Sequence, residues 1–261
     1  MPNDAAFLVQ DDGPIRLLTL DNAARRNPLS SALIAGLREA LAEAGRMPRL
    51  RVVILAAEGP AFSAGHDLAE IQAARAADDC GRGFFERLMA DCAALMREIV
   101  GLPIPVIAAV EGIATAAGCQ LVASCDLAIA GSGARFATPG VHIGLFCSTP
   151  MVALSRNLSN KHAMEMLLGG DMIDAETAAR FGLVNRVVAA GEALAAARAL
   201  ALQIASKPPA TIRIGKAAFY HQREMPLEDA YAYASRVMVE NMLHNEAIDG
   251  IGAFMDRKKP A

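Results

Sequence analysis

This sequence has no cluster of basic residues. Its 25 lysines and arginines are spread along the chain, the net charge is -3 and the pI is near 6.0. Concentrated positive charge is the electrostatic footprint of proteins that bind nucleic acid or anionic membranes. The composition therefore argues against both partners and leaves small uncharged or modestly anionic molecules open.

Disulfide frameworks and zinc knuckles are also missing. The five cysteines are odd in number and none is spaced as CxxC. The first residues, MPNDAAFLVQDDG, contain acidic residues and no positively charged region before a long apolar stretch, unlike a secretory signal peptide. We expect no metal site and a reducing, cytoplasmic location.

No apolar run is both long and uninterrupted. The most apolar tract, residues 102–130, is broken by residues that are costly in lipid: Pro103, Pro105, Glu111, Gln120 and Asp126. We interpret the tract as buried core and expect no membrane partner. Glu111, between a strand and a glycine turn, is interpreted as an exposed loop carboxylate.

What the sequence does contain is an alternation of strand-like and helix-like segments over its first two thirds. Strands are predicted at 15–20, 51–55, 106–110 and 127–130, and helices at 30–44, 84–99 and 116–124. From residue 151 the pattern is nearly all helical, with one more strand at 183–188. Because 54% of the residues are hydrophobic, the chain can bury a sizeable core. From the alternation of strands and helices we predict an α/β fold.

Two loops rich in small residues interrupt this pattern, GPAFSAGHDLAEI and the start of EGIATAAGCQLVASCDLAIA. Small residues let another molecule approach the backbone closely, and the first N–H groups of a helix have no partner within the helix. Two such donors converging on one oxygen would form an oxyanion hole for an enolate-like anion. Tight packing of the chain is the alternative reason for these glycines and alanines.

Four stretches together resemble the successive signatures of one family: AFSAGHDL, EGIATAAGCQLVASCDLAIA, LLGGDMIDAETAARFGLVNRVV and NEAIDGIGAFMDRKKP. Their order and spacing, with the short segment RRNPL before the first helix, are similar to the crotonase family, the enoyl-CoA hydratases and isomerases. A narrower resemblance, in ATAAGCQLVASCDLA and FATPGVHIGLFCSTP, is to one vertebrate subgroup of that family.

The resemblance implies a crotonase-like spiral of ββα units over residues 1–200. It also implies a C-terminal helical region over residues 201–261 that packs subunits into homotrimers, often paired as dimers of trimers. The implied ligand is an acyl-CoA thioester, with no cofactor besides the coenzyme A of the substrate itself.

By position in the family's motifs, the backbone N–H groups of His66 and Ala117 would form the oxyanion hole, while the His66 ring would lie in solvent or against phosphate. Coenzyme A contacts are implied for Arg25 or Arg26 near phosphate, for Ala64, His66, Asp67 and Leu68 along the adenine and pantetheine path, and for Phe254 and Lys258 reaching a neighbouring subunit's nucleotide. From the residues alone, Asp67 is expected to cap a helix.

The sequence departs from the family's hydratases at two positions. Those enzymes use two glutamates, and the matching residues here are Gln120 and Gly140. Hydration needs one group to take a proton from water and one to give a proton to the α-carbon, and a glutamine amide cannot take up a proton near neutral pH. Ordinary hydratase activity is therefore expected to be very low. Gln120 is left to orient water or substrate, or to pack as a satisfied polar group.

Cys147 is the candidate for replacement chemistry, because GLFCSTP lies at or next to the position where some other members of the family carry a catalytic aspartate. A thiolate is both nucleophile and base, and His142 could activate it, whereas a buried structural cysteine is the alternative. Three hypotheses follow: an enzyme that stabilises an enolate, for isomerisation, C–C bond chemistry or residual hydration; an acyl-CoA-binding pseudoenzyme; and a Cys147-dependent thioesterase.

Overall fold

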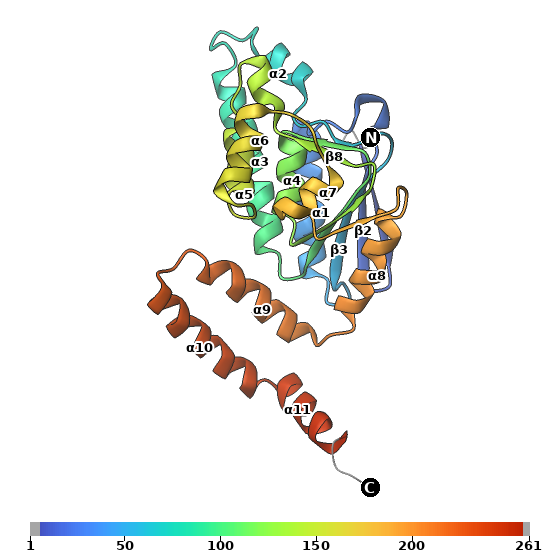
Figure 1. Ribbon diagram of the computed structural model, residues 1–261, viewed down its shortest axis with the longest axis vertical. Coiled ribbons are helices and arrows are strands. Elements are labelled where there is room, and N and C mark those ends of the chain that lie inside the picture. Colours follow the sequence, from blue (N-terminus) through green and yellow to red (C-terminus); the bar gives the residue numbers. More distant parts are fainter. Residues whose placement is uncertain (1–5, 258–261) are drawn as a thin grey trace. The chain divides into compact units, whose positions relative to one another are not determined.

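The computed structural model describes residues 6–257. By its internal contacts the chain divides into two units, Met1–Leu202 and Gln203–Ala261. The first unit holds both β-sheets and the helices packed on them, and the second is helical (Figure 1). Within the described residues, no helix is long and apolar enough to cross a bilayer.

The larger sheet of the first unit has six strands in the order β1-β2-β3-β5-β7-β10. They are β1 (Phe7–Asp12), β2 (Ile15–Leu20), β3 (Val52–Ala57), β5 (Val106–Val110), β7 (Leu127–Gly131) and β10 (Arg186–Val188). β1 and β2 form an antiparallel hairpin, and the other neighbours are parallel. The strands β2, β3 and β5 are buried almost throughout, because helices cover both faces of the sheet.

The smaller sheet has four short strands in the order β4-β6-β8-β9. They are β4 (Ala61–Ser63), β6 (Ile113–Thr115), β8 (Arg135–Ala137) and β9 (Ile173–Asp174). Because β4, β6 and β8 are parallel, their carboxyl ends meet at one edge of the sheet. The segments that begin at residues 64, 116 and 138 are therefore brought together there.

The chain alternates between the two sheets as it advances. The strand pairs β3/β4, β5/β6 and β7/β8 each place one strand in the large sheet and the next in the small sheet, and helical structure follows each pair. These following elements are α2 (Leu68–Ala74) with α3 (Arg82–Gly101), then α4 (Ala117–Ser124), then the 3-10 turn η2 (Pro139–Ile143) with α5 (Ser148–Leu154). This succession is a spiral of ββα units.

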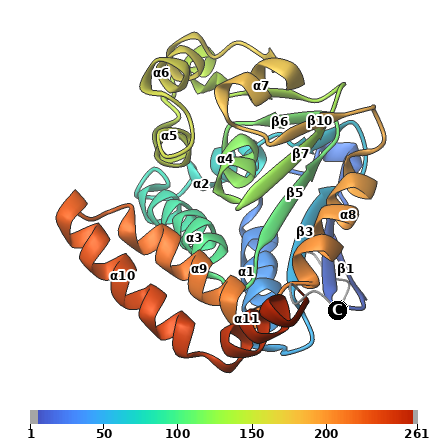
Figure 2. The same cartoon turned by 60° about the horizontal axis from the view of Figure 1, so that its bottom comes forward.

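Helix α1 (Ser31–Arg46) precedes the first of these pairs. The Ser30 side chain accepts the N–H of Leu33 and so caps the helix, as Ser at this position favours. Its apolar positions Leu33, Ile34 and Leu37 are at most 2% exposed and join the core that α3, α4 and the strands share. Figure 2 shows α1 and α3 on one side of the large sheet and α8 (Ala193–Ala205) on the other.

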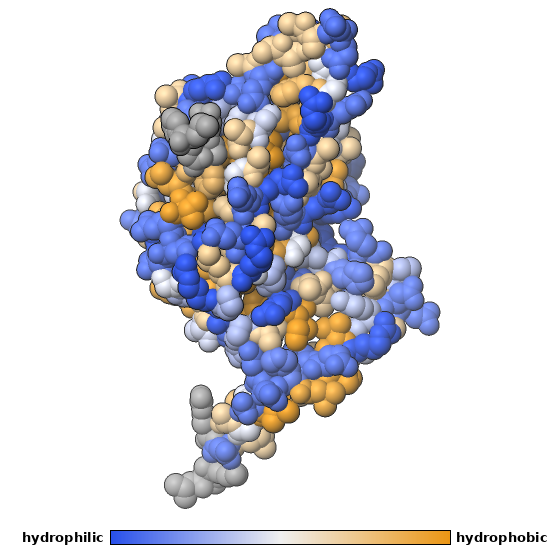
Figure 3. Space-filling view, turned by 180° about the vertical axis from the view of Figure 1, so that it is seen from behind, coloured by the Kyte–Doolittle hydropathy of each residue, from blue (hydrophilic) through white to orange (hydrophobic). Residues whose placement is uncertain are grey.

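The remaining helices of the first unit are η1 (Ala23–Arg25), α6 (Asn160–Gly169) and α7 (Ala175–Phe181). The second unit is formed by α9 (Pro209–Gln222), α10 (Leu227–Leu243) and α11 (Asn245–Arg257). The Glu246 carboxylate accepts the N–H groups of Ala210 and Thr211, which links the start of α11 to the start of α9. Large apolar side chains lie on the surface of this unit (Figure 3): Phe219, Leu227, Tyr231, Met238, Val239, Met242, Leu243, Ile248, Ile251, Phe254 and Met255.

The predicted strands and helices are found, but β1 and the short strands β4, β6, β8 and β9 were not predicted. Two further expectations are corrected. The strand expected at 183–188 is limited to Arg186–Val188, because Leu183 and Val184 are buried in the turn after α7. Glu111 is not a free loop carboxylate: its Oε1 accepts the N–H groups of Gly191 and Ala193 at 3.0 Å and caps the start of α8.

Candidate active site

A cavity of about 620 Å³ lies at the carboxyl edge of the small sheet. Its walls come from the segment after β4, from α2 and α3, from the β6–α4 junction and from residues 139–150. Most lining side chains are apolar: Leu68, Ile71, Phe85, Leu88, Met89, Pro139, Ile143, Leu145, Phe146 and Pro150. Among the described residues that line it there is no aspartate or glutamate, and Arg75 is the one permanently charged side chain.

The two small-residue loops meet in this cavity. Gly65 has φ +94°, and a Cβ built on it would lie 3.3 Å from the Ala117 nitrogen. A Cβ on Gly118 would lie at a clashing distance from the backbone oxygen of Ser63. Glycine is therefore required at both positions for β4 and the start of α4 to approach this closely. The contact brings the backbones of His66 and Ala117, both of which line the cavity, next to each other.

Neither of these two backbone N–H groups donates a hydrogen bond within the described part of the chain. Ala117 is the first residue of α4, where the N–H has no intrahelical acceptor. Ala116 before it has φ 50° and ψ -119°, a conformation that L-residues rarely adopt, and its N–H is held by the Ala137 oxygen. Strain of this kind is stored mainly at functional sites. The local chain thus presents two unpartnered donors in an apolar cavity.

The His66 ring does not lie in solvent, contrary to the expectation from sequence. Nδ1 is 3.4 Å from the Leu29 oxygen, and Nε2 is buried without a partner among the described residues. Burial lowers the pKa of His66 below its ordinary value of 6.5, which outweighs the opposing effects of the Leu29 carbonyl and the Glu70 charge. The imidazole is therefore neutral at physiological pH.

Asp67 caps α2, as predicted: its Oδ1 accepts the N–H of Ala69 at 2.9 Å. The same oxygen forms a 2.8 Å ion pair with Arg25. Both residues line a separate cavity of about 290 Å³, together with Glu70. Arg26 has no ion-pair partner among the described residues, so it is the freer of the two arginines.

Gln120 lies on α4 and is 3% exposed, but it does not line the large cavity. Its Oε1 is buried and has no hydrogen-bond partner within residues 6–257. Buried polar atoms usually have a partner, so this oxygen is available to a water or a ligand atom. Gln120 can therefore act on a molecule in the cavity only through an intervening water or after its side chain moves.

Gly140, Cys147 and His142 all line the cavity. A Cβ on Gly140 would lie 2.5 Å from the Leu145 oxygen and 3.0 Å from the Cys147 Sγ, so the 145–147 segment fills the space that a larger residue would need. Burial raises the pKa of the Cys147 thiol, partly offset by the Gly140 N–H. The His142 ring lies against Gly170, and no hydrogen bond joins it to Cys147 in the described structure. The alternative in which His142 activates the Cys147 thiol thus has no hydrogen bond to support it among the described residues.

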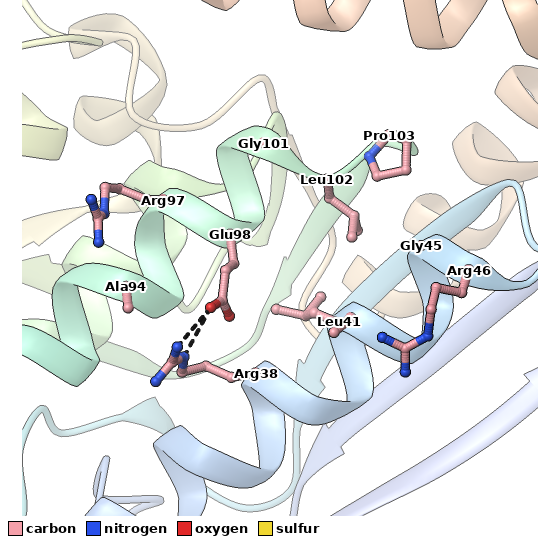
Figure 4. A pocket seen from close by; sticks show the side chains of 11 residues that line it. Arg38, Leu41, Gly45, Arg46, Ala94, Arg97, Glu98, Gly101, Leu102 and Pro103 are labelled. Atoms are coloured by element: carbon pink, nitrogen blue, oxygen red, sulfur yellow. Dashed lines mark hydrogen bonds and ion pairs between the residues drawn. The ribbon is translucent and has the colours of Figure 1, made fainter.

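A further cavity, of about 610 Å³, lies between α1 and α3 (Figure 4). In this cavity the Arg38 Nε and Nη2 groups both donate to the Glu98 Oε1, and Leu41 and Leu102 also line it. Arg38 also pairs with Asp91 at 2.9 Å, and the Glu98 Oε2 is buried without a hydrogen-bond partner among the described residues. None of the residues predicted from sequence lines this cavity. It is not the candidate active site.

The sequence-predicted residues do not all come together, and Arg26 lines neither the large cavity nor the smaller one. Those that line the large cavity are Ala64, His66, Leu68, Ala117, Gly140, His142 and Cys147, whereas Gln120 is buried beside it, and Arg25 and Asp67 line the smaller cavity. Phe254 is exposed on α11 in the second unit, and Lys258 lies outside the described residues. Arg75 and Phe85 escaped prediction, although Leu68, Ile71 and Arg75 share one helical face by their spacing.

The profile of the enoyl-CoA hydratase/isomerase family matches residues 11–261, and the chain belongs to this family. A crystal structure of an enoyl-CoA hydratase from Mycobacterium smegmatis superposes with a TM-score of 0.92 at 46% identity and covers 98% of each chain. The predicted crotonase-like α/β fold is thereby confirmed.

Within the family, the enoyl-CoA hydratase domain-containing protein 3 of Rattus norvegicus, named as mitochondrial, is 44% identical over 96% of this chain and 82% of its own length. The crystal structure of the human protein of that name has a TM-score of 0.91 at 41% identity, covering 98% of this chain and 99% of the other. A putative enoyl-CoA hydratase of Thermus thermophilus is 32% identical over 96% of this chain and 98% of its own length. The narrower resemblance to the domain-containing protein 3 subgroup is confirmed.

Proposed function

We propose that the chain binds an acyl-CoA thioester in the 620 Å³ cavity and polarises the thioester oxygen between the N–H groups of His66 and Ala117. The observation that carries this proposal is that two unpartnered backbone donors, held together by Gly65 and Gly118, line one apolar cavity. Hydrogen bonds to that oxygen would stabilise the negative charge it gains in any reaction that passes through an enolate. In a dry site such donors are stronger than in water.

Coenzyme A would follow the segment that leaves the cavity past Ala64 and Leu68. Arg26 is the better candidate for a phosphate contact, because Arg25 is already paired with Asp67.

From the family resemblance we further propose that the chain forms homotrimers or dimers of trimers, with Phe254 and Lys258 reaching a neighbour's nucleotide. Apolar side chains exposed on α10 and α11 support an interaction surface there. The cysteines found in the structure are free, in keeping with a reducing compartment such as the cytoplasm.

Ordinary hydration is expected to be very slow. No carboxylate among the described residues lines the cavity, so no side chain there matches the two glutamates of the family's hydratases. Each acid or base group commonly contributes about a hundredfold or more to rate. The same observation favours a second candidate, an acyl-CoA-binding pseudoenzyme that keeps the two donors and lacks proton transfer.

Crotonyl-CoA hydration, followed by loss of the enoyl absorbance, separates the hypotheses. The wild type should turn over at a rate close to background, and Gln120→Glu should raise the rate, while Gln120→Met, of similar length and without a titratable group, should not. Gln120→Glu is a cleaner variant than one that adds Gly140→Glu, because the Leu145 oxygen blocks a side chain at 140. Robust wild-type turnover would contradict the requirement for the glutamates.

Thioester hydrolysis through Cys147 is a third candidate, supported by the position of this residue in the cavity wall. Its raised pKa opposes nucleophilic attack near neutral pH. If Cys147 is the nucleophile, Cys147→Ala abolishes release of free coenzyme A. Unchanged release in that variant would remove this candidate.

A further inference from the structure

Arg75 is the unusual member of the cavity wall. It is the one permanently charged side chain among the described lining residues, and it faces a cavity made otherwise of apolar groups, two histidines and two hydroxyls. Arg75 is an exposed residue, so water solvates its guanidinium until a ligand displaces that water, and a charge that loses its water needs another acceptor. A ligand that fills this cavity must therefore supply that acceptor or leave Arg75 in water.

The guanidinium is held in place by an aromatic ring. Its Cζ lies 5.5 Å from the centroid of the Phe85 ring, within the range of cation–π attraction. Phe85 also lines the cavity, and its ring lies close against Gly81, where a Cβ would be 2.8 Å from the ring. The Phe85 N–H donates to the Gly81 oxygen at 2.9 Å. The cation is thus positioned over the wall formed by the start of α3.

No carboxylate of the described residues forms an ion pair with Arg75. The neighbouring Asp79 is committed elsewhere, because its two oxygens accept the N–H groups of Gly81 and Gly83 at 2.9 and 2.8 Å. Arg82, in contrast, has Glu86 within 3.8 Å. The positive charge of Arg75 is therefore available to a ligand.

Arg75 lies at the far end of α2 from the two backbone donors. The seven-residue helix α2 separates it from His66 and Asp67, and at a rise of about 1.5 Å per residue this is a distance of about 10 Å along the helix. With carbon–carbon bonds of about 1.5 Å, an extended acyl chain of about eight carbons covers a similar span. The wall between the two ends, formed by Leu68, Ile71 and Leu88, is apolar.

We infer that the acyl group bound in this cavity carries a carboxylate at the end remote from the thioester, and that Arg75 is the residue that recognises it. This inference rests on the proposed function. A carboxylate fits the planar guanidinium with two charge-assisted hydrogen bonds, which a methyl terminus cannot provide and a hydroxyl provides only in part. The ligand class is thus the mono-coenzyme A thioester of a dicarboxylic acid.

The test compares two ligands that differ only at the remote end, octanoyl-CoA and suberyl-CoA, by calorimetric titration. Arg75→Leu should weaken suberyl-CoA binding about tenfold and leave octanoyl-CoA within about twofold, because a charge-assisted contact is lost for one ligand only. Arg75→Lys should fall between the wild type and Arg75→Leu. The matched control Arg82→Leu, which removes an arginine that does not line the cavity, should change neither affinity.

Each other outcome overturns the inference in a recognisable way. Equal effects of Arg75→Leu on both acyl ligands, or none on suberyl-CoA, show that Arg75 does not recognise the remote carboxylate, while octanoyl-CoA binding keeps the proposed function intact. An equal loss for free coenzyme A assigns Arg75 to a phosphate instead. If neither acyl-CoA binds the wild type, the proposed function fails and this inference fails with it. Should Arg75→Leu not fold, Arg75→Lys carries the same comparison.

Discussion

Around the cavity, Gly65 and Gly118 are small because neighbouring chain segments occupy the space that a side chain would need. The polar groups that result are main-chain N–H groups, which do not titrate and do not depend on side-chain identity. The two N–H groups therefore do not depend on which side chains stand at positions 120 and 140.

Gly140→Ala should lower the free energy of unfolding by about 1–3 kcal/mol, since the new methyl group would meet the Leu145 oxygen at 2.5 Å and force a backbone shift. Urea denaturation measures the change. The matched control is Gly133→Ala, where no atom lies within 4 Å of the added methyl group. Equal stability of the two variants would show that the 145–147 segment does not close over Gly140.

His66 predicts an acid-sensitive component of stability. Burial lowers the pKa of His66 in the folded chain, so the unfolded chain binds the proton more readily. The contribution of the neutral ring to the free energy of unfolding is therefore complete above pH 6.5 and is lost as the pH falls below that value. His66→Gln should flatten the stability profile between about pH 5 and pH 7. A wild-type profile that rises on acidification through this range, and that the variant leaves unchanged, would contradict the burial of the ring.

Cys147 should be slow to alkylate at neutral pH, because burial raises its pKa and keeps it a thiol. Iodoacetamide labelling followed by mass spectrometry should show Cys80, which is exposed, reacting first, and Cys147 reacting mainly in alkaline solution. Rapid labelling of Cys147 near pH 7 would revive the thioesterase hypothesis.

At the scale of elements, the long segments with a clear apolar pattern were predictable, whereas the exposed edge strand β1 and the short strands were not. The strand at 106–110 and the helix at 30–44 have clear apolar periodicities, whereas β4, β6 and β8 have only three residues each and owe their pairing to the neighbouring turns of the spiral. These short strands bring the site segments together. The sequence therefore indicated which loops carry the donors, but their convergence rested on the family resemblance.

The Glu111 cap is a testable link between elements. Glu111→Ala should destabilise the first unit by about 1 kcal/mol, because two N–H groups at the start of α8 lose their acceptor. Thermal unfolding beside the control Glu192→Ala, an exposed neighbour whose side chain has no such contact among the described residues, measures the effect. A smaller loss for Glu111→Ala than for the control would be inconsistent with a capping role.

At the scale of the whole molecule, the second unit has most of its large apolar side chains at the surface. Light scattering should give about three or six times the chain mass of 27.4 kDa. Met242→Asp, placed on the exposed apolar face of α10, should dissociate the assembly, while Glu240→Asp, an exposed and conservative change on the same helix, should not. A monomeric wild type at all concentrations would contradict the proposed trimer.

The central claim is that two backbone donors hold the oxygen of a bound thioester, and the carbonyl stretch of that thioester tests it most directly. Infrared difference spectra with acyl-CoA carrying a 13C-labelled carbonyl should show a lowered stretching frequency on binding to the wild type. The shift should persist in Gly13→Ala, a glycine with φ +56° in open space, and vanish in Gly65→Ala, whose methyl group lies 3.3 Å from the Ala117 nitrogen. A bound thioester whose carbonyl frequency equals that in water, or a shift unchanged in Gly65→Ala, would contradict the account.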